Sequence, residues 1–199
     1  MTLDIWHLKD ALPAAAEAAV RMADWGTEVT REGAGPGSLE DAGLHYFVVD
    51  GYTLGSKPAG ITLLGWIHGR LPAIVSACVG EPVAISTDVR TAINVNVLRG
   101  RGERYELHTD PCTYSALLFA SGPHAGGQWY AQPCDGMVGV TVRPEPGDLV
   151  VFRGDIPHCV LPLAGDETRI SVPVALYPQG EENITRDPAL DAHIFGEGS

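Results

Sequence analysis

The sequence predicts a mainly β fold with flanking helices, arranged as a β-sandwich or jelly roll. From residue 82 onward, short runs rich in Val, Ile, Thr and aromatic residues recur between Gly, Pro and Asp, which is typical of short strands and turns. Before residue 82, strong helix formers and longer apolar runs predominate. The 199 residues fit a single domain, and at this length about 70% of the unfolded chain's surface can be buried.

Residues 1–81 are expected to supply helices and an edge strand that support a barrel. A helix is expected over 12–24, where Ala and Glu are frequent and a Pro stands near the start. A strand is expected at 45–49. Residues 60–79 are expected to be helical, with Pro72 breaking or restarting the run. These helices should pack on the outside of a sheet.

Residues 82–177 are expected to form the barrel itself. The predicted strands lie near 82–87, 92–98, 105–109, 114–120, 128–132, 138–143, 148–152, 158–162 and 168–176. Residues 178–199 are polar and end in Gly-Glu-Gly-Ser, which predicts a tail or short lid with a frayed end.

The charge of the chain argues against nucleic acid as a partner. It has 25 acidic and 13 basic residues, so its formal net charge is −12 and a polyphosphate would meet an unfavourable field. Arg99, Arg101 and Arg104 are the closest approach to a basic cluster. Glu103 and Glu106 interleave with them, and such a mixed run is expected to be a solvated turn.

The chain is expected to be cytoplasmic and to have no membrane contact. Its first residues have neither a basic start nor a continuous apolar stretch, and no segment is expected to reach the roughly 20 apolar residues of a membrane span. The cysteines lack the close paired spacing of a zinc cluster or a redox dithiol and are expected to be small apolar residues of the core or near the site. They are Cys78, Cys112, Cys134 and Cys159.

Three residues indicate a metal site: His108, Asp110 and His158. If residues 105–110 are extended, side chains two positions apart face the same side, so His108 and Asp110 converge. A distant histidine then completes a set of two imidazoles and one carboxylate. Such a set leaves coordination positions open, which suits a non-haem Fe(II) oxygenase better than a closed structural zinc site.

Arg169 and Ser171 are candidates for binding a carboxylate. They share one face of a predicted strand and offer a guanidinium fork and a hydroxyl. The neighbouring Ile170, Val172 and Val174 indicate that this strand is buried, where an unpaired charge is costly. Arg169 therefore needs an anionic partner, and a dicarboxylate cosubstrate would supply one.

Four further residues are weaker candidates. Asn94 and Asn96 share a face of a predicted strand, and their amides need partners, either a polar substrate or water. Trp129 either lines the substrate entrance or is a core aromatic residue. Tyr105 either packs in the barrel wall or helps to hold the cosubstrate or substrate with its hydroxyl.

The same residues stand in a family pattern over about residues 92–177. The matching stretches are Asn96–Asp110, Gly126–Trp129, Pro144–Phe152, Pro157–Val160 and Arg169–Val172. In order and spacing they resemble the Fe(II)- and 2-oxoglutarate-dependent dioxygenases, particularly the prolyl 4-hydroxylase-like branch. His-x-Asp alone would be a weak signal, but several separated segments agree.

The resemblance implies a double-stranded β-helix, a cupin-like jelly-roll barrel that carries Fe(II) in its mouth. It implies that His108, Asp110 and His158 are the iron ligands. It also implies that Arg169, assisted by Ser171, pairs with the distal carboxylate of 2-oxoglutarate. Oxidation of an unactivated C–H bond by O₂, with release of succinate and CO₂, is the chemistry it implies.

Departures from related patterns refine this expectation. Asp110 stands where halogenases of the superfamily have a small residue, so halogenation is not expected. Ala175 stands where the nucleic-acid demethylases carry a second arginine. Arg99 stands where members of the branch often have a tyrosine, and Leu118 stands about where some members have a tyrosine near the cosubstrate.

The leading functional hypothesis is hydroxylation of a small molecule such as an amino acid or biosynthetic intermediate, by a monomer or homodimer. Little sequence remains outside the barrel to form a long peptide groove. A peptidyl, prolyl-type hydroxylase is an alternative, and so is a non-catalytic metal-binding jelly-roll sensor or binding protein. A cupin-type enzyme that does not use 2-oxoglutarate is a further alternative, although cupins generally carry His-x-His where this chain has His-x-Asp.

Overall fold

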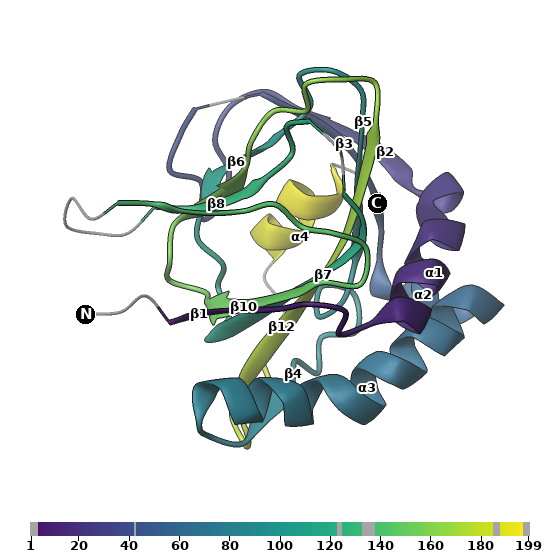
Figure 1. Ribbon diagram of the computed structural model, residues 1–199, viewed down its shortest axis with the longest axis vertical. Helices are drawn as coiled ribbons and strands as arrows, with labels where there is room; N and C mark the ends of the chain where they lie inside the picture. The colour runs from purple at the N-terminus through teal and green to yellow at the C-terminus, as the bar shows by residue number, and fades with distance from the viewer. Residues whose placement is uncertain (1–3, 42, 123–124, 133–137, 185–187, 197–199) are drawn as a thin grey trace.

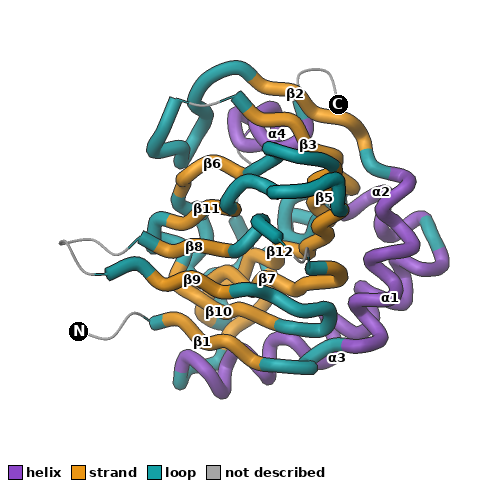
Figure 2. Tube along the Cα trace, turned by 45° about the horizontal axis from the view of Figure 1, so that its top comes forward, coloured by secondary structure: helices purple, strands orange, loops and turns teal. Residues whose placement is uncertain are grey.

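Two β-sheets face each other in the computed structural model, and helices cover the outer side of the larger sheet (Figures 1 and 2). The structure describes residues 4–41, 43–122, 125–132, 138–184 and 188–196. The larger sheet has the strand order β1-β10-β7-β12-β5-β3-β2, with β4 also paired to β12. The smaller sheet has the order β6-β11-β8-β9. Neighbouring strands are antiparallel, and this architecture is the predicted double-stranded β-helix, or jelly roll.

The elements follow one another along the chain with these bounds. The strands are β1 (Ile5–Leu8), β2 (Thr27–Arg31), β3 (Leu44–Val49), β4 (Val83–Ile85), β5 (Val95–Arg99), β6 (Tyr105–His108), β7 (Tyr114–Ser121), β8 (Trp129–Ala131), β9 (Val140–Val142), β10 (Leu149–Arg153), β11 (His158–Val160) and β12 (Thr168–Pro178). The helices are α1 (Pro13–Met22), the 3₁₀ turn η1 (Ala23–Trp25), α2 (Gly51–Ser56), α3 (Pro58–Val79) and α4 (Pro188–Phe195).

The predicted strands after residue 82 are all present as β4 to β12, each within a few residues of its expected bounds. The N-terminal part contributes β1, β2 and β3, where the sequence indicated one edge strand, and that strand, β3, is an inner strand between β5 and β2. Strands β1 and β2 are the edges of the larger sheet, and β2 carries the exposed Thr27 and Glu28. These two polar residues interrupt the alternation of apolar and polar residues by which a strand is predicted.

Helix α3 attaches the helical layer to the larger sheet. Leu63, Ile67, Leu71 and Val75 recur every four residues and are fully buried in the main core, together with apolar residues of α1 and of the sheet. Gly80, with φ of 80°, ends the helix in the left-handed conformation that favours glycine. The helix positions the sheet from outside and leaves its inner face free for the site.

Two sequence-based expectations about α3 were wrong. The helix runs through Pro72 without a break, because Leu71 and Val75 anchor the turns on both sides of it in the core. Although no segment was expected to be apolar enough for a membrane span, the helix is long and apolar enough to cross a bilayer by length and composition alone. A single such helix is weak evidence for a membrane span, since core helices pass the same test.

The C-terminal segment contains a helix where a polar tail or lid was predicted. Helix α4 lies at the opening between the two sheets (Figure 1). Phe195 is buried, and its ring lies 4.5 Å from the Arg90 guanidinium carbon. The hydroxyl of Tyr46 donates a hydrogen bond to the carbonyl of Ile194. These contacts hold α4 against the barrel mouth.

Candidate active site

The structure brings His108, Asp110 and His158 together at the barrel mouth. One ligand atom from each lies within 4.8 Å of the others. The Nε2 atom of His108 is 3.4 Å from Asp110 Oδ1, and the Nε2 atom of His158 is 3.6 Å from Asp110 Oδ2. His108 and His158 are direct partners on the adjacent strands β6 and β11. These are the three residues that the sequence predicted as metal ligands, in an arrangement that fits one metal ion.

Both imidazoles are held with Nε2 free for a metal. His108 Nδ1 lies 2.8 Å from the carbonyl of Glu106, and His158 Nδ1 lies 2.9 Å from the carbonyl of Ile156. A carbonyl only accepts, so each Nδ1 carries the proton and donates it, which fixes the tautomer. This is the usual way in which a second hydrogen bond orients a metal-binding histidine.

Burial and their mutual charges shift the pKa values of these three side chains. Burial alone would raise the pKa of Asp110, but the two histidines more than offset it and lower that pKa. Burial likewise lowers the pKa of His108, but the hydrogen bond and charge of Asp110 raise it overall. Burial, followed by the charge of His108, lowers the pKa of His158 to about 4.

Further contacts orient Asp110. Its backbone N–H donates to the carbonyl of Gly154 at 2.8 Å. The hydroxyl of Ser115 donates to Asp110 Oδ2, and the Cys112 thiol lies 3.1 Å from the same hydroxyl. The sequence did not indicate this role of Ser115, because it depends on how the connection between β6 and β7 turns the serine back towards Asp110. Among the cysteines, Cys78, Cys112 and Cys159 are free thiols, and Cys134 lies outside the described residues.

A β-bulge brings Tyr105 to the same cavity as His108. Strand β6 pairs with β11 through His108–His158 and Tyr105–Val160, so one extra residue of β6 lies between these two pairs. The ring of Tyr105 is 5.1 Å from His108 and 5.3 Å from Tyr46. Burial raises the pKa of Tyr105 well above its usual value, so its hydroxyl stays protonated.

Arg169 is buried in the cavity, with 2% of its surface exposed. Its Nε donates to the carbonyl of Gly127 at 3.0 Å, and its Nη1 donates to Ser171 Oγ at 2.9 Å. Its Nη2 has no hydrogen-bond partner, and within the described part of the chain no carboxylate pairs with this guanidinium. Burial lowers the pKa of Arg169 to about 9. A buried cation with an open donor fits an anionic ligand, as the sequence predicted.

One cavity of about 370 Å³ joins the three metal-ligand candidates to Arg169. All the residues that the sequence singled out line it: Asn94, Asn96, Tyr105, His108, Asp110, Trp129, His158, Arg169 and Ser171. The two groups of candidates therefore belong to a single site. Its size is at the lower end of the roughly 300–1,000 Å³ typical of small-molecule pockets.

The weaker candidates differ in how they contribute. Asn96 Oδ1 is a buried acceptor without a partner, and Asn94 is 5% exposed. Trp129 is fully buried in the core between the sheets, with its ring 5.9 Å from that of His158 and 4.9 Å from that of Phe152. It is thus both a core aromatic residue and part of the wall that fixes His158.

The structure corrects the expectation for Leu118. This side chain is buried in the core beneath the helices, on the outer side of the larger sheet. Strand residues alternate between faces, and it is the adjacent Leu117 that lines the cavity. Leu117, and not Leu118, therefore faces the cavity.

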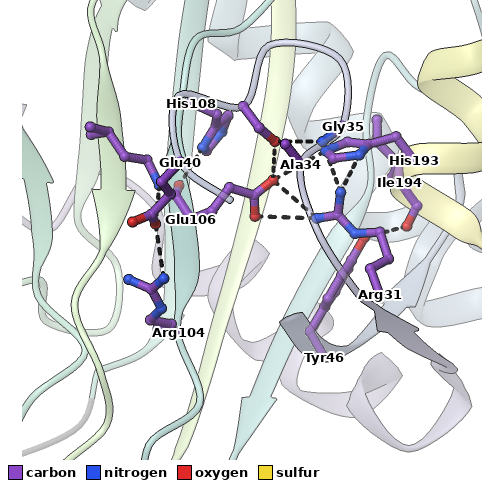
Figure 3. A network of polar contacts seen from close by, with 12 residues as sticks. Arg31, Ala34, Gly35, Glu40, Tyr46, Arg104, Glu106, His108, His193 and Ile194 are labelled. Atoms are coloured by element: carbon purple, nitrogen blue, oxygen red, sulfur yellow. Dashed lines mark hydrogen bonds and ion pairs between the residues drawn. The ribbon is translucent and has the colours of Figure 1, made fainter. Parts of the chain in front are cut away.

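Glu106 is the main functional residue that the sequence analysis misjudged. It was placed in a solvated turn, but it is 2% exposed and lies at the centre of a polar network (Figure 3). Arg31 donates to both of its carboxylate oxygens at 3.1 and 3.2 Å. Ser38 donates at 3.0 Å, and His193 Nε2 lies 3.1 Å away. These partners come from β2, the loop after it and α4, which are far from Glu106 in the sequence. The residues next to Glu106 in the sequence therefore do not indicate its burial.

This network fixes the charge of Glu106 and the strand that carries His108. Burial alone would raise the pKa of Glu106, but the hydrogen bond from His193 and the charge of Arg31 lower it to about 2. The carbonyl of Glu106 accepts the hydrogen bond from His108 Nδ1. Glu106 thus joins α4 and the N-terminal loop to a metal-ligand candidate.

No protein-family model and no curated protein matches the chain. Solved structures do. A 2OG-Fe(II) oxygenase family oxidoreductase from Burkholderia pseudomallei matches with a TM-score of 0.66 and 15% identity, over 87% of this chain and 84% of that one. A prolyl hydroxylase from Trichoplax adhaerens, in complex with a hypoxia inducible factor peptide, matches with a TM-score of 0.66 and 14% identity, over 94% and 89%.

A third similar structure is the epimerase SnoN of nogalamycin biosynthesis, in complex with Fe³⁺, alpha-ketoglutarate (2-oxoglutarate) and nogalamycin RO. Its TM-score is 0.63 and its identity 18%, over 87% of this chain and 78% of that one. At these identities the similarity is one of fold. The chain has the double-stranded β-helix fold of the 2-oxoglutarate- and Fe(II)-dependent oxygenases, the superfamily that its own motifs resemble.

Proposed function

We propose that the protein is a non-haem Fe(II)- and 2-oxoglutarate-dependent dioxygenase that hydroxylates, or otherwise oxidises, an unactivated C–H bond of a small molecule. An amino acid or a biosynthetic intermediate is the expected type of substrate. The observation that carries this proposal is the single cavity that holds both the His108–Asp110–His158 cluster and the buried Arg169 with its open donor. Fe(II), 2-oxoglutarate and O₂ supply the oxidising chemistry when bound, with release of succinate and CO₂.

The side chains of the protein have distinct tasks in this proposal. His108, Asp110 and His158 hold the metal through atoms that are already oriented by hydrogen bonds. Arg169 and Ser171 hold the distal carboxylate of 2-oxoglutarate, which supplies the missing anion. The protein contributes orientation and exclusion of water, since the metal and cosubstrate carry out the difficult step.

The size of the cavity supports a small substrate. It measures about 370 Å³ and must also contain 2-oxoglutarate. Leu190 and Ile194 of α4 line it and narrow its mouth. A peptidyl substrate is the second candidate, because one structural neighbour is a prolyl hydroxylase solved with a peptide. A peptide would have to enter past α4, which favours the small molecule here.

An anaerobic titration of the metal-free protein with Fe(II) and 2-oxoglutarate tests the proposal. The expected result is a weak visible metal-to-ligand charge-transfer band that saturates at one equivalent of each. Addition of O₂ and a panel of candidate substrates should then convert 2-oxoglutarate to succinate faster with a true substrate. The absence of the band in protein that circular dichroism shows to be folded would refute the proposal.

The alternatives give different results in this experiment. A non-catalytic sensor would give the band but no substrate-stimulated succinate. A cupin-type enzyme that does not use 2-oxoglutarate would give no band and would be insensitive to replacement of Arg169. The cytoplasmic location, the absence of nucleic-acid and membrane partners, and the monomeric or homodimeric state stay predictions from the sequence.

A further inference from the structure

The cavity extends past the metal centre to a second polar end. Every second residue of β12 from Arg169 to Tyr177 lines it, as expected for one face of a strand. Ala175 pairs with Ser115, the residue that donates to Asp110. Arg169 stands six residues before this pair and Tyr177 two residues after it. The metal-ligand candidates therefore lie between the guanidinium and the tyrosine.

This second end, the distal chamber (Asp88, Asn94 and Tyr177), has polar groups with no protein partner. Asn94 is 5% exposed and lines the cavity, and its side-chain amide has no hydrogen bond to any described residue. The hydroxyl of Tyr177 likewise makes none within the described ranges. Both side chains line the cavity, so their polar groups can donate to or accept from a polar ligand there.

Asp88 adds a negative charge to the distal chamber. Strand β4 pairs with β12 so that Ala84 is opposite Tyr177, and Asp88 follows β4 along the cavity wall. Its Oδ1 accepts from the Arg90 N–H at 3.0 Å, and its Oδ2 accepts from Thr91 Oγ1 at 2.7 Å. A carboxylate has about four acceptor positions, so each oxygen can accept one more hydrogen bond.

The described lining of the cavity offers little positive charge to an anionic substrate. Among the described residues that line the cavity, Arg169 is the only arginine or lysine, and the proposed function assigns it to 2-oxoglutarate. A substrate carboxylate in the distal chamber would face Asp88 without a positive partner. The net charge of −12 acts in the same direction.

We propose that the distal chamber binds a compact substrate that carries an amino group, with the ammonium held by Asp88. Tyr177 and Asn94 bind neighbouring polar groups of that substrate. Burial raises the pKa of Tyr177 to about 12, so its hydroxyl remains a donor at neutral pH. Leu190 and Ile194 offer apolar contact to the carbon skeleton. This inference rests on the proposed function, because it takes Arg169 to be occupied by 2-oxoglutarate.

Binding of three probes with one ring but different charge tests the inference. Full-length protein is loaded with Mn(II) and 2-oxoglutarate, and cyclohexylamine, cyclohexanol and cyclohexanecarboxylate are titrated separately. Paramagnetic broadening of their proton NMR signals reports binding close to the metal. The proton signals of cyclohexylamine should broaden saturably. Cyclohexylamine should bind at least about tenfold more tightly than cyclohexanecarboxylate, as expected for a charge-assisted hydrogen bond.

Two variants locate the interaction. Asp88→Asn should weaken the binding of cyclohexylamine by about tenfold or more, since the charge-assisted hydrogen bond is lost. It should leave the affinity for cyclohexanol within about twofold of that of the unsubstituted protein. Tyr177→Phe leaves the Asp88 turn intact and should weaken both probes by roughly two- to tenfold. Asp166→Asn, which removes an exposed carboxylate outside the cavity lining, is the matched control and should change neither.

The outcomes separate this inference from the proposed function. If Mn(II) and 2-oxoglutarate do not bind together, as judged by water-proton relaxation, the proposed function fails. If they bind but cyclohexylamine shows no saturable broadening, or cyclohexanecarboxylate binds as tightly, the amine specificity is overturned. It is also overturned if folded Asp88→Asn protein binds cyclohexylamine as the unsubstituted protein does.

Discussion

Arg169 donates a hydrogen bond of 2.9 Å from Nη1 to the hydroxyl of Ser171, two residues further along the same strand. A second bond, from Nε to the carbonyl of Gly127, fixes the other edge of the guanidinium. These two bonds hold the planar group in one orientation and leave Nη2 as a buried donor for a ligand. A flexible ammonium could not reproduce this arrangement.

Replacement of Arg169 should therefore weaken 2-oxoglutarate binding. Arg169→Ala is expected to raise the dissociation constant for 2-oxoglutarate by roughly 10- to 100-fold, because a charge-assisted hydrogen bond is lost. Arg169→Lys should recover only part of this, since lysine lacks the guanidinium fork. The charge-transfer band under anaerobic conditions measures the constant. Arg21→Ala, at a largely exposed arginine, is the control, and an unchanged 2-oxoglutarate requirement in Arg169→Ala would contradict the assignment.

Ser115→Ala should weaken metal binding while the protein stays folded. The hydroxyl of Ser115 fixes the carboxylate of Asp110, and loss of such supporting hydrogen bonds typically costs 10- to 100-fold in metal affinity. Competition with a coloured chelator for Co(II) or Zn(II) measures this affinity without turnover. Ser56→Ala, at an exposed serine of α2, is the matched control. Equal affinities in the two variants would show that Asp110 does not depend on Ser115.

The strand periodicity and local motifs account for much of what the sequence predicted. His108 and Asp110 are two residues apart, and His158 begins a strand beside them, so motif spacing was enough to place the metal-ligand candidates. Strand β6 ends at His108, so Asp110 lies beyond the strand, although the prediction took residues 105–110 to be extended. The hydrogen bond from Asp110 N–H to the carbonyl of Gly154 brings the carboxylate into place regardless.

The residues that sequence reasoning missed depend on contacts between distant segments. Glu106 lies in a run of alternating charges, and its burial follows from Arg31 and His193, which are 75 and 87 residues away. Tyr177 belongs to the inward face of β12, but nothing local distinguishes it from a tyrosine of the core. Alternation along β12 would have placed it on the face of Arg169 had the strand been extended to Pro178.

Glu106 should make the stability of the metal-free protein depend on acid pH. Its folded-state pKa of about 2 lies below the ordinary value of 4.5, so its stabilising effect is complete above about pH 4.5. That contribution, roughly 3 kcal/mol, is lost as the pH falls from about 4.5 towards 2. Glu106→Gln should lower the free energy of unfolding at pH 7 and flatten its decline over this range. Urea denaturation at a series of pH values, with EDTA present, measures both effects.

A surface glutamate provides the comparison for Glu106. Glu17→Gln removes an exposed carboxylate that pairs with Arg21 on α1, and such pairs contribute roughly 0.5 kcal/mol or less. Its pH profile should follow that of the unsubstituted protein. If Glu106→Gln and Glu17→Gln gave the same profile, the buried network would contribute nothing to the acid sensitivity of the fold.

Two glycines should respond to alanine in opposite directions. Gly37 has φ of +79°, and a Cβ there would lie 2.5 Å from the carbonyl oxygen of Thr109, the residue between His108 and Asp110. Gly37→Ala should destabilise the protein by roughly 1–3 kcal/mol, because an alanine in this conformation is strained and the backbone must move. The same movement should weaken Co(II) or Zn(II) binding. Gly65 in α3 has nothing within 4 Å of the added Cβ, so Gly65→Ala should stabilise by roughly 0.5–1 kcal/mol.

Chemical denaturation and metal competition on the two alanine variants separate a local effect from a general one. Gly65→Ala should leave metal affinity unchanged, since α3 lies on the outer side of the larger sheet (Figure 2). Gly37→Ala should change both stability and metal affinity, because the Thr109 N–H donates to the Gly37 carbonyl at 2.9 Å and ties the loop to the strand end. A Gly37→Ala protein with lowered stability but full metal affinity would show that the loop supports the fold without positioning His108 and Asp110.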